Sequence, residues 1–244
     1  MKGYRISILR HGRTSANDDG IYIGKTDLPL SEEGKEELRI QYQMHEYPKV
    51  ERVYSSPLER AIQSAEILFP DREIVLVDDL REMDFGIFEG VKAEEAVELD
   101  SYKKWLKGGL DNPPPNGESL RSMLLRCYTS LDAIIRDMMT NGIVRAGIVT
   151  HSGIMMNMLS CFGLPKMKAM DLMCGMGEGY EIMVTAQMWQ NGKTFEILGK
   201  IPGGDSVGYN DAGELIAEDY RADYGNRAEE YSDYFNDEDI SFYE

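Results

Sequence analysis

Short runs of Ile, Val, Leu and Tyr alternate with longer amphipathic segments along most of the chain. The short runs predict β-strands, because β-branched and aromatic side chains favour extended backbone. The longer segments repeat apolar residues at helical spacing and therefore predict helices. The predicted strands are 4–10, 51–55, 73–77, 144–150, 181–189 and 194–200. The predicted helices are 31–45, 57–69, 92–107, 118–140 and 152–162.

This alternation predicts an α/β fold, a three-layer αβα sandwich around a mostly parallel central sheet. The proline-rich stretch 111–117 predicts a stiff, non-helical loop before the long helix that Glu118 and Ser119 open. Ligands of such sheets bind beyond the carboxyl ends of the strands, so residues that follow strands are the first candidates for a site.

The last part of the chain differs from the rest in charge. Residues 203–244 hold 13 Asp and Glu against 2 Arg, a net charge of −11. We therefore predict a domain over residues 1–202 and a separate acidic segment over 203–244, joined at Gly203–Gly204. The segment also contains six of the chain's 14 tyrosines, which is unusual for a purely solvated acidic tail. Two interpretations stay open: it docks on the core or on a partner, or it is mainly mobile.

The overall charge of −17 argues against binding to nucleic acid or to an anionic membrane surface. A phosphate site in such a chain has to be locally positive. No apolar run approaches the roughly 20 residues that span a membrane, and the start of the chain resembles no secretory signal. The three cysteines, Cys127, Cys161 and Cys174, form neither a disulfide framework nor a metal-binding set. We expect a cytoplasmic location, no metal and no membrane contact.

The first candidate for chemistry is His11, which follows the predicted strand 4–10 between Arg10 and Gly12. A neutral imidazole is a good nucleophile near neutral pH. Arginine presents a permanent cationic fork that matches phosphate oxygens, and glycine allows the backbone to approach a ligand closely. The pattern suits attack on a phosphate, while a hydrogen-bonded loop histidine is the plainer interpretation of the same three residues.

A second block surrounds Arg60. Ser56 and Glu59 have the spacing of a capping box, with Pro57 at the first helical position. Arg60 lies off the apolar stripe in the first turn, where the helix dipole slightly disfavours a cation. A bound anion would explain its presence there, and so would exposure to solvent or to an acidic partner.

The loop over residues 80–90 contains the candidate proton donor, Glu82. Cleavage of a phosphate ester needs a proton for the departing oxygen, and a partly buried carboxyl holds one near neutral pH. Glu82 lies beside Arg81 among apolar neighbours. A surface glutamate paired with a base is the commoner outcome for any single Glu.

A second histidine, His151, also follows a predicted strand and precedes an apolar helix. The amides of Ser152 and Gly153 would lie at that helix start, ready to donate to a phosphate oxygen. His151 could then add a hydrogen bond or a charge to a transferred phosphoryl group. His11 and His151 thus occupy matching positions and are expected at the same edge of the sheet.

Taken together, these blocks resemble the histidine phosphatase superfamily, which includes cofactor-dependent phosphoglycerate mutases and bacterial α-ribazole phosphatases. The resemblance runs from about residue 4 to residue 200. It rests on Arg10-His11-Gly12-Arg13-Thr14, Asn17, Gly24, Asp27, Leu30, Ser31, Gly34, Ser55-Ser56-Pro57, Arg60-Ala61, Glu82, Phe85-Gly86, Glu89-Gly90, Pro115, Gly117-Glu118-Ser119 and His151.

The resemblance implies that His11 becomes a phosphohistidine and that Glu82 donates the proton, without metal or organic cofactor. From the residues and the resemblance together, the expected contacts of the phosphoryl group are Arg10, Arg60, His151 and Ser152, and Asn17 is expected to contact the phosphate or the substrate. The role of Asn17 comes from the resemblance alone. The expected function is a phosphatase that hydrolyses a small phosphomonoester, with a small phosphorylated metabolite as its partner.

Two departures from the mutase pattern favour the phosphatase. Mutases of this family usually carry a tryptophan after the glycine that matches Gly24, and here the residue is Lys25. The stretch between Glu82 and the helix 118–140 also lacks the longer insertion typical of mutases. A mutase-type phosphoryl transfer remains the alternative, as does a catalytically silent relative that binds phosphorylated ligands.

Residues 204–208 fit the G-x-S-x-G pattern of serine hydrolases. That fold needs its histidine after the serine, and the sequence holds no histidine beyond His151. We therefore set this interpretation aside.

Overall fold

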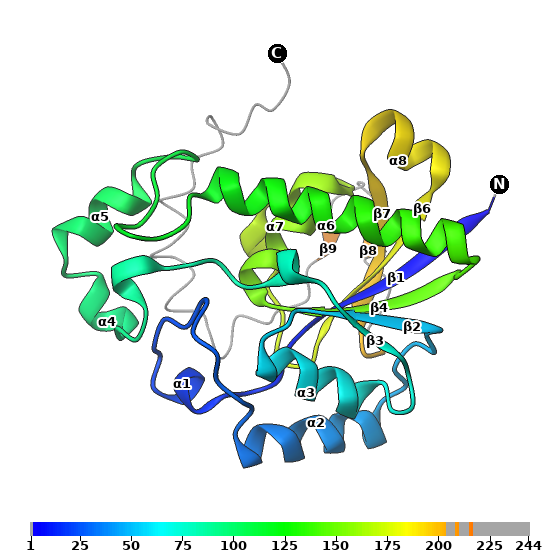
Figure 1. Ribbon diagram of the computed structural model, residues 1–244, viewed down its shortest axis with the longest axis horizontal. Coiled ribbons are helices and arrows are strands. Elements are labelled where there is room, and N and C mark those ends of the chain that lie inside the picture. The colour runs from blue at the N-terminus through cyan, green and yellow to red at the C-terminus, as the bar shows by residue number, and fades with distance from the viewer. Residues whose placement is uncertain (1, 204–207, 210–214, 217–244) are drawn as a thin grey trace.

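The computed structural model describes residues 2–203, 208–209 and 215–216. It shows an α/β fold with a seven-stranded sheet in the order β3-β2-β4-β1-β6-β7-β5 (Figure 1). The strands are β1 (Gly3–Arg10), β2 (Arg52–Ser55), β3 (Ile74–Leu76), β4 (Arg145–Thr150), β5 (Gly163–Leu164), β6 (Gly179–Thr185) and β7 (Phe195–Ile201). A separate two-stranded pair joins β8 (Gly208–Tyr209) to β9 (Leu215–Ile216).

The sheet is mostly parallel, as the sequence predicted. β1 pairs with β4, β4 with β2, and β2 with β3 in parallel, and β5 is parallel to β7. β6 runs antiparallel to both of its neighbours, β1 and β7. The remainder of the predicted acidic segment, including Ser206 of the G-x-S-x-G pattern, lies outside the described residues, so the boundary at residue 202 stays a prediction.

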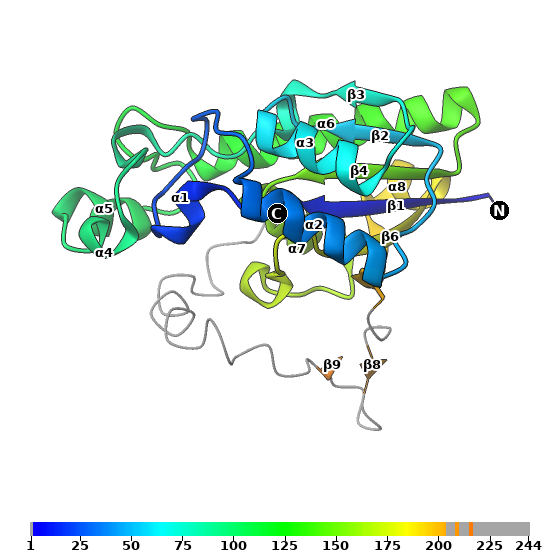
Figure 2. The same cartoon turned by 90° about the horizontal axis from the view of Figure 1, so that it is seen from below.

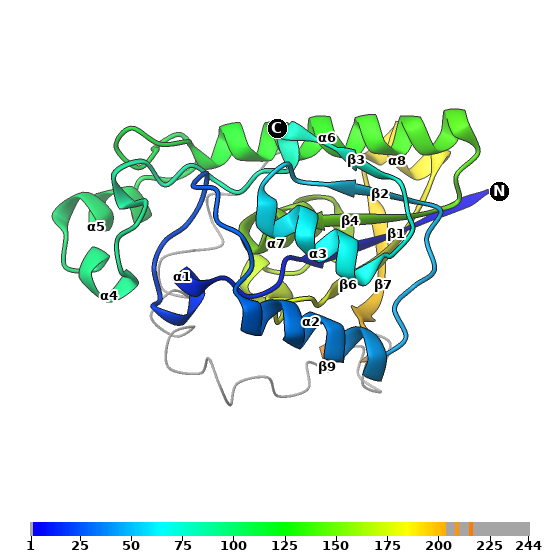
Figure 3. The same cartoon turned by 60° about the horizontal axis from the view of Figure 1, so that its bottom comes forward.

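Helices cover both faces of the sheet. The α-helices are α1 (Ser15–Asp18), α2 (Glu32–Met44), α3 (Glu59–Leu68), α4 (Ala93–Ala96), α5 (Asp100–Leu106), α6 (Leu120–Asn141), α7 (Ser152–Phe162) and α8 (Ala186–Gly192). Short 3₁₀ helices span Asp78–Leu80, Gly86–Phe88 and Ala169–Leu172. Figure 1 shows α6 on one side of the strands and α2 and α3 on the other, and Figure 3 shows α2 and α3 side by side.

Side chains that alternate along the strands fill two hydrophobic cores, one on each face of the sheet. Ile8 and Ile148 point into the larger core with α6 and α7, whereas their neighbours Leu9 and Val149 point into the core with α2 and α3. Successive side chains of a strand face opposite sides of the sheet, so continuous apolar strands supply both layers at once. This produces the three-layer sandwich that the sequence predicted.

The register of β1 and β4 determines where the two predicted imidazoles lie. Arg10 pairs with Thr150, and the amide of His11 donates to the carbonyl of Thr150 at 2.9 Å. His11 and His151 each follow the last paired residue of adjacent parallel strands. They therefore leave the same edge of the sheet next to each other, as expected.

The predicted helix 92–107 is wrong in extent, because the chain breaks it into α4 and α5. Tyr102 of α5 is buried against Phe88 and Trp105, with ring centroids 5.3 and 5.5 Å apart. Ala96 of α4 belongs to the same small core as Phe88 and Tyr102, so both short helices pack against it. Figure 2 shows both helices beyond the carboxyl end of β1, at the end of the sheet where the histidines lie.

Two further predictions need correction. The predicted strand 181–189 ends at Thr185, whose hydroxyl accepts from the amide of Met188 at 3.2 Å and begins α8. Ser56 does not cap α3, which begins after Leu58. Instead the carboxylate of Asp27, distant in sequence, accepts from the amide of Glu59 at 2.7 Å. Ser119 does cap α6, as expected, by accepting from the amide of Ser122.

Among the described helices, none combines the length and the apolar character that crossing a bilayer requires.

Candidate active site

His11 and His151 lie together at the carboxyl edge of the sheet. Their ring centroids are 5.1 Å apart and their planes are inclined by 61°. His11 is 7% exposed and His151 is fully buried. The strand register therefore places both residues as the sequence indicated.

The hydrogen bonds of His11 define its tautomer. Its Nδ1 lies 2.6 Å from the carbonyl oxygen of Gly12. A carbonyl only accepts, so Nδ1 carries the proton and the lone pair is on Nε2. Burial lowers the pKa of His11 well below its ordinary value, and the cations of Arg60 and Arg10 lower it further. The ring is therefore neutral at pH 7, and its Nε2 lone pair accepts no hydrogen bond from the described residues.

His151 is held through its other nitrogen. Its Nε2 lies 2.8 Å from the hydroxyl oxygen of Ser56, the residue that sequence analysis assigned to a helix cap. Its Nδ1 is buried and has no hydrogen-bond partner in the described structure. Burial lowers the pKa of His151 well below its usual value, and His11 and Arg60 add to the effect. A neutral ring with an unpartnered buried nitrogen is suited to contact a polar ligand.

Two guanidinium groups supply the local positive charge that a phosphate site needs. Arg60 is 1% exposed and donates to the carbonyls of Thr26 and Gly24 at 2.8 and 2.7 Å. Arg10 donates from Nη1 to the carbonyl of Cys174 at 3.0 Å, and its buried Nε has no partner among the described residues. Arg60 thus does not face bulk water. Both Arg60 and Arg10 are close enough to His11 to lower the pKa of its imidazole.

Glu82 is turned toward the start of α7. Its carboxylate accepts from the amides of Met83 at 2.9 Å and Gly153 at 3.1 Å. Burial raises the pKa of Glu82 above its usual value, opposed by these two hydrogen bonds and by the charges of Arg60 and Arg126. A carboxyl with a raised pKa holds its proton closer to neutral pH, which a proton donor requires.

This contact corrects one sequence expectation. The amide of Gly153 donates to Glu82 and is therefore not left to donate to a phosphate oxygen. Ser152 is the first residue of α7 and is half-buried beside His151.

Asn17 has a local partner in the structure. Its Oδ1 accepts from both the amide and the hydroxyl of Thr14, each at 2.9 Å. Asn17 is half-buried in α1, the short helix that follows His11. Its amide nitrogen is therefore the group through which it could bind a ligand.

The sequence did not reveal the contacts through which several residues support the site. Ser64 accepts from the amide of Gly12 at 2.9 Å, and Ser56 contacts His151. Glu89 binds the backbone of the loop at Gly24–Thr26, and Arg126 binds the backbone around Glu82. Their partners are far away in sequence, so local spacing carries no signal for these contacts.

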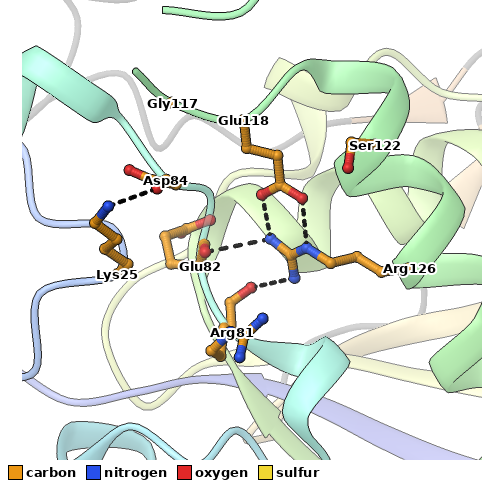
Figure 4. A pocket seen from close by; sticks show the side chains of 8 residues that line it. All are labelled: Lys25, Arg81, Glu82, Asp84, Gly117, Glu118, Ser122 and Arg126. Carbon is orange, nitrogen blue, oxygen red and sulfur yellow. Dashed lines mark hydrogen bonds and ion pairs between the residues drawn. The ribbon is translucent and has the colours of Figure 1, made fainter. Parts of the chain in front are cut away.

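A polar cavity of about 540 Å³ opens beside Glu82 (Figure 4). Its wall also includes Lys25, Asp84, Ser122 and Arg126. Lys25 pairs with Asp84 at 2.7 Å, and Arg126 pairs with Glu118. Charges of both signs therefore line this cavity.

Comparison with known proteins defines the class to which this fold and site belong. The family model described as the histidine phosphatase superfamily (branch 1) matches residues 6–191. That region covers more than half of the chain and contains every candidate site residue. The protein belongs to the histidine phosphatase superfamily.

Curated relatives carry names of two kinds. Phosphoglycerate mutase-like protein 4 of Arabidopsis thaliana is 32% identical over 156 residues, which cover 61% of this chain and 66% of that protein. This chain therefore spans just under two thirds of that relative's length. The adenosylcobalamin/alpha-ribazole phosphatase of Escherichia coli K12 is 26% identical over 166 residues, covering 66% of this chain and 80% of that protein.

Solved structures agree on the fold. A putative alpha-ribazole-5'-P phosphatase from Escherichia coli superposes with a TM-score of 0.69 at 21% identity, covering 85% of this chain and 99% of the other. A phosphoglycerate mutase from Bacillus anthracis gives 0.66 at 21% identity, with coverages of 84% and 93%. Family and relatives support a phosphatase or another phosphoryl-transfer enzyme.

Proposed function

We propose that the protein is a phosphatase that hydrolyses a small phosphomonoester through a phosphohistidine on His11. The observation that carries this proposal is the pair of neutral imidazoles, His11 and His151, 5.1 Å apart beside two guanidinium groups. Such a cluster binds a tetrahedral anion and offers it a nucleophile, although the chain as a whole is strongly acidic.

In the first step, the Nε2 lone pair of His11 attacks phosphorus while the bond from phosphorus to the ester oxygen breaks. Protonated Glu82 gives its proton to that oxygen, and the alcohol leaves. Arg10, Arg60 and the unpartnered nitrogen of His151 bind the equatorial phosphoryl oxygens in this proposal. Phosphoryl transfer depends mainly on such positioning and charge neutralisation.

In the second step, the carboxylate of Glu82 takes a proton from water. The resulting hydroxide attacks the phosphohistidine and releases inorganic phosphate, which restores His11. Dividing one displacement into two is the advantage of a covalent intermediate. In this proposal, Ser152 and the amide nitrogen of Asn17 also contact the phosphate or the substrate.

The test is release of phosphate from p-nitrophenyl phosphate by the full chain. We expect turnover by the wild type, loss of turnover in His11→Ala, and little change in His45→Ala, whose side chain is exposed at the end of α2. The trapped phosphoenzyme should be labile in acid and stable in base. A base-labile adduct would point to serine or to an acyl phosphate instead.

The mutase alternative rests on a relative's name, phosphoglycerate mutase-like protein 4. A panel of phosphorylated metabolites that includes 3-phosphoglycerate, with and without 2,3-bisphosphoglycerate, separates the two. Free phosphate supports the phosphatase and isomerised product supports the mutase. Binding of vanadate without turnover of any phosphomonoester would identify a catalytically silent relative.

We further propose a cytoplasmic location and a small phosphorylated metabolite as substrate. Cys127, Cys161 and Cys174 are free thiols in the structure, as is usual in a reducing compartment.

A further inference from the structure

Arg126 of α6 binds three backbone carbonyls of the segment that carries Glu82. Its Nη1 donates to the carbonyl oxygens of Asp79 and Arg81 at 2.8 and 2.6 Å. Its Nη2 donates to the carbonyl oxygen of Glu82 at 3.2 Å. The side chain is only 12% exposed, and Figure 4 shows its guanidinium between this segment and Glu118.

Glu118 fixes the other side of the same guanidinium. Its two carboxylate oxygens accept from Nε and Nη2 of Arg126, each at 2.7 Å, in a bidentate pair. The Glu118 side chain is 15% exposed, so both partners are largely removed from water. A bidentate arginine–carboxylate pair has a defined geometry, unlike the point charge of a lysine.

The backbone of Glu118 extends this clamp beyond Glu82. Its amide donates to the carbonyl of Asp84 at 2.9 Å. The next residues are held by the same loop, because the amide of Ile87 donates to the carbonyl of Pro115 at 3.0 Å. The proton-donor segment is therefore fixed before, at and after Glu82 by the Arg126–Glu118 pair and its loop.

We propose that Arg126 is a positioning residue for the proton donor, holding the backbone from Asp79 to Glu82 so that the carboxyl of Glu82 meets the departing oxygen. Arg126 contacts this segment through backbone carbonyls, while Glu118 orients its guanidinium, and it acts through Glu82. The inference rests on the proposed function, since it gives Glu82 the role described there. A misplacement of about 1 Å in a reacting group is enough to slow an enzyme about a hundredfold.

The charge of Arg126 gives the proposal a second, measurable consequence. The charged groups that act on Glu82 are Arg60 from α3 and Arg126 from α6, and both lower its pKa. His151 lies two residues before Gly153, the amide of which binds the same carboxylate. Loss of Arg126 should therefore raise the pKa of Glu82 further.

The experiment compares Arg126→Lys and Arg126→Met with a matched control on the same helix, Arg136→Met. Arg136 pairs with Asp132 at the surface and is 73% exposed. Each variant is assayed on an alkyl phosphate, whose leaving alcohol needs a proton, and on p-nitrophenyl phosphate, whose leaving group does not. Thermal melting confirms that the variants are folded.

We expect both Arg126 variants to lose about tenfold or more in kcat/KM on the alkyl phosphate and less than about threefold on p-nitrophenyl phosphate, because loss of a general acid matters most for poor leaving groups. The Arg136 control should keep both activities. In Arg126→Met the alkaline limb of the pH profile should move to higher pH. Equal losses on both substrates with an unmoved limb would overturn the proposal.

A readout without turnover separates this inference from the proposed function. The full chain is labelled with ¹³C at glutamate carboxyls, and the Glu82 signal is assigned with Glu82→Gln. We expect Arg126→Met to titrate Glu82 at least about half a pH unit above the wild type, with a smaller change in Arg126→Lys. If the wild type lacks phosphatase activity, the proposed function is refuted. The titration still shows whether Arg126 influences Glu82. An unchanged titration in a folded Arg126→Met would refute its influence on Glu82.

Discussion

Arg60 and Glu89 bind the same loop, Arg60 as a cation that donates to its carbonyls and Glu89 as an anion that accepts from its amides. The guanidinium of Arg60 donates to the carbonyls of Gly24 and Thr26. The carboxylate of Glu89 accepts from the amides of Gly24 at 3.1 Å, Lys25 at 3.1 Å and Thr26 at 3.3 Å. The three amides and the carbonyls of Gly24 and Thr26 are thus bound by buried Arg60 and half-buried Glu89. These contacts fix the loop beside the site together with the guanidinium of Arg60, which lies within the site.

The first prediction concerns Glu89→Gln. A Gln side chain has one acceptor oxygen, so its NH₂ group would face amide donors in place of accepting from them. We expect a loss of about 2 kcal/mol in unfolding free energy and about a tenfold fall in kcat/KM as the loop loosens around Arg60. Urea unfolding and a phosphatase assay measure these effects. Glu98→Gln, on the exposed surface between α4 and α5, is the control, and an equally small effect in both variants would contradict the prediction.

The second prediction concerns Arg60→Lys. An ammonium group keeps the charge but does not reproduce the planar fork that reaches the carbonyls of Gly24 and Thr26. We expect kcat/KM to fall by about a hundredfold or more and vanadate to bind more weakly. Isothermal titration with vanadate provides the measurement. Wild-type affinity in Arg60→Lys would show that charge alone suffices at this position.

The third prediction tests the position of Glu82 by crowding it. A methyl group at Gly153 would lie 2.6 Å from Oε1 of Glu82, and only that flexible carboxylate has to move. Gly153→Ala should therefore fold normally and displace the carboxylate of Glu82. We expect turnover of alkyl phosphates to fall about tenfold more than that of p-nitrophenyl phosphate. Gly3→Ala, where a methyl group finds ordinary contacts, serves as the control. Equal rates for Gly153→Ala and the wild type would argue against Glu82, in the position described here, as the general acid.

The fourth prediction concerns stability against pH. The pKa values of His11 and His151 are lowered in the folded chain, so below about pH 6.5 the unfolded chain binds more protons. Unfolding free energy should therefore fall as pH drops below about 6.5, by up to about 1.4 kcal/mol per pH unit for each ring. Glu82 opposes this trend, because its raised pKa makes the folded chain bind its proton first. Urea melts between pH 7 and 5 measure the slope.

Two variants check the origin of that slope. His151→Gln should make the loss of stability with falling pH shallower, since one buried imidazole is removed. Glu82→Gln should make it steeper, since the opposing carboxyl is removed. The same slope in all three proteins would mean that neither buried group governs stability in this range.

The sequence predicted most of the fold because its strands and long helices are governed by local patterns. The apolar runs became β1, β2, β3, β4 and β7 within a few residues, and the stripes of apolar residues became α2, α3, α6 and α7. The prediction of a mostly parallel sheet also held. From it followed the expectation that His11 and His151 would share one edge, which the register of β1 and β4 confirms.

The errors occurred where a distant group competed with a local pattern. Ser56 and Glu59 have the spacing of a capping box, but the Ser56 hydroxyl meets His151 and Asp27 caps the helix. The interval 92–107 has helical propensity throughout, but Ala96 and Tyr102 belong to the same small core as Phe88, and the chain forms two short helices there.

The sequence by itself determined the class of the fold, the two strand-end histidines and the presence of arginines and a glutamate suited to phosphate chemistry. These follow from side-chain identity and from the periods of helix and strand, which act over a few residues. Only the tertiary structure decided which nitrogen of His11 carries its lone pair, that Arg60 and Glu89 share a loop, and that Arg126 and Glu118 hold the segment around Glu82. Each of these depends on hydrogen bonds between segments brought together by packing, and their partners leave no mark in local spacing.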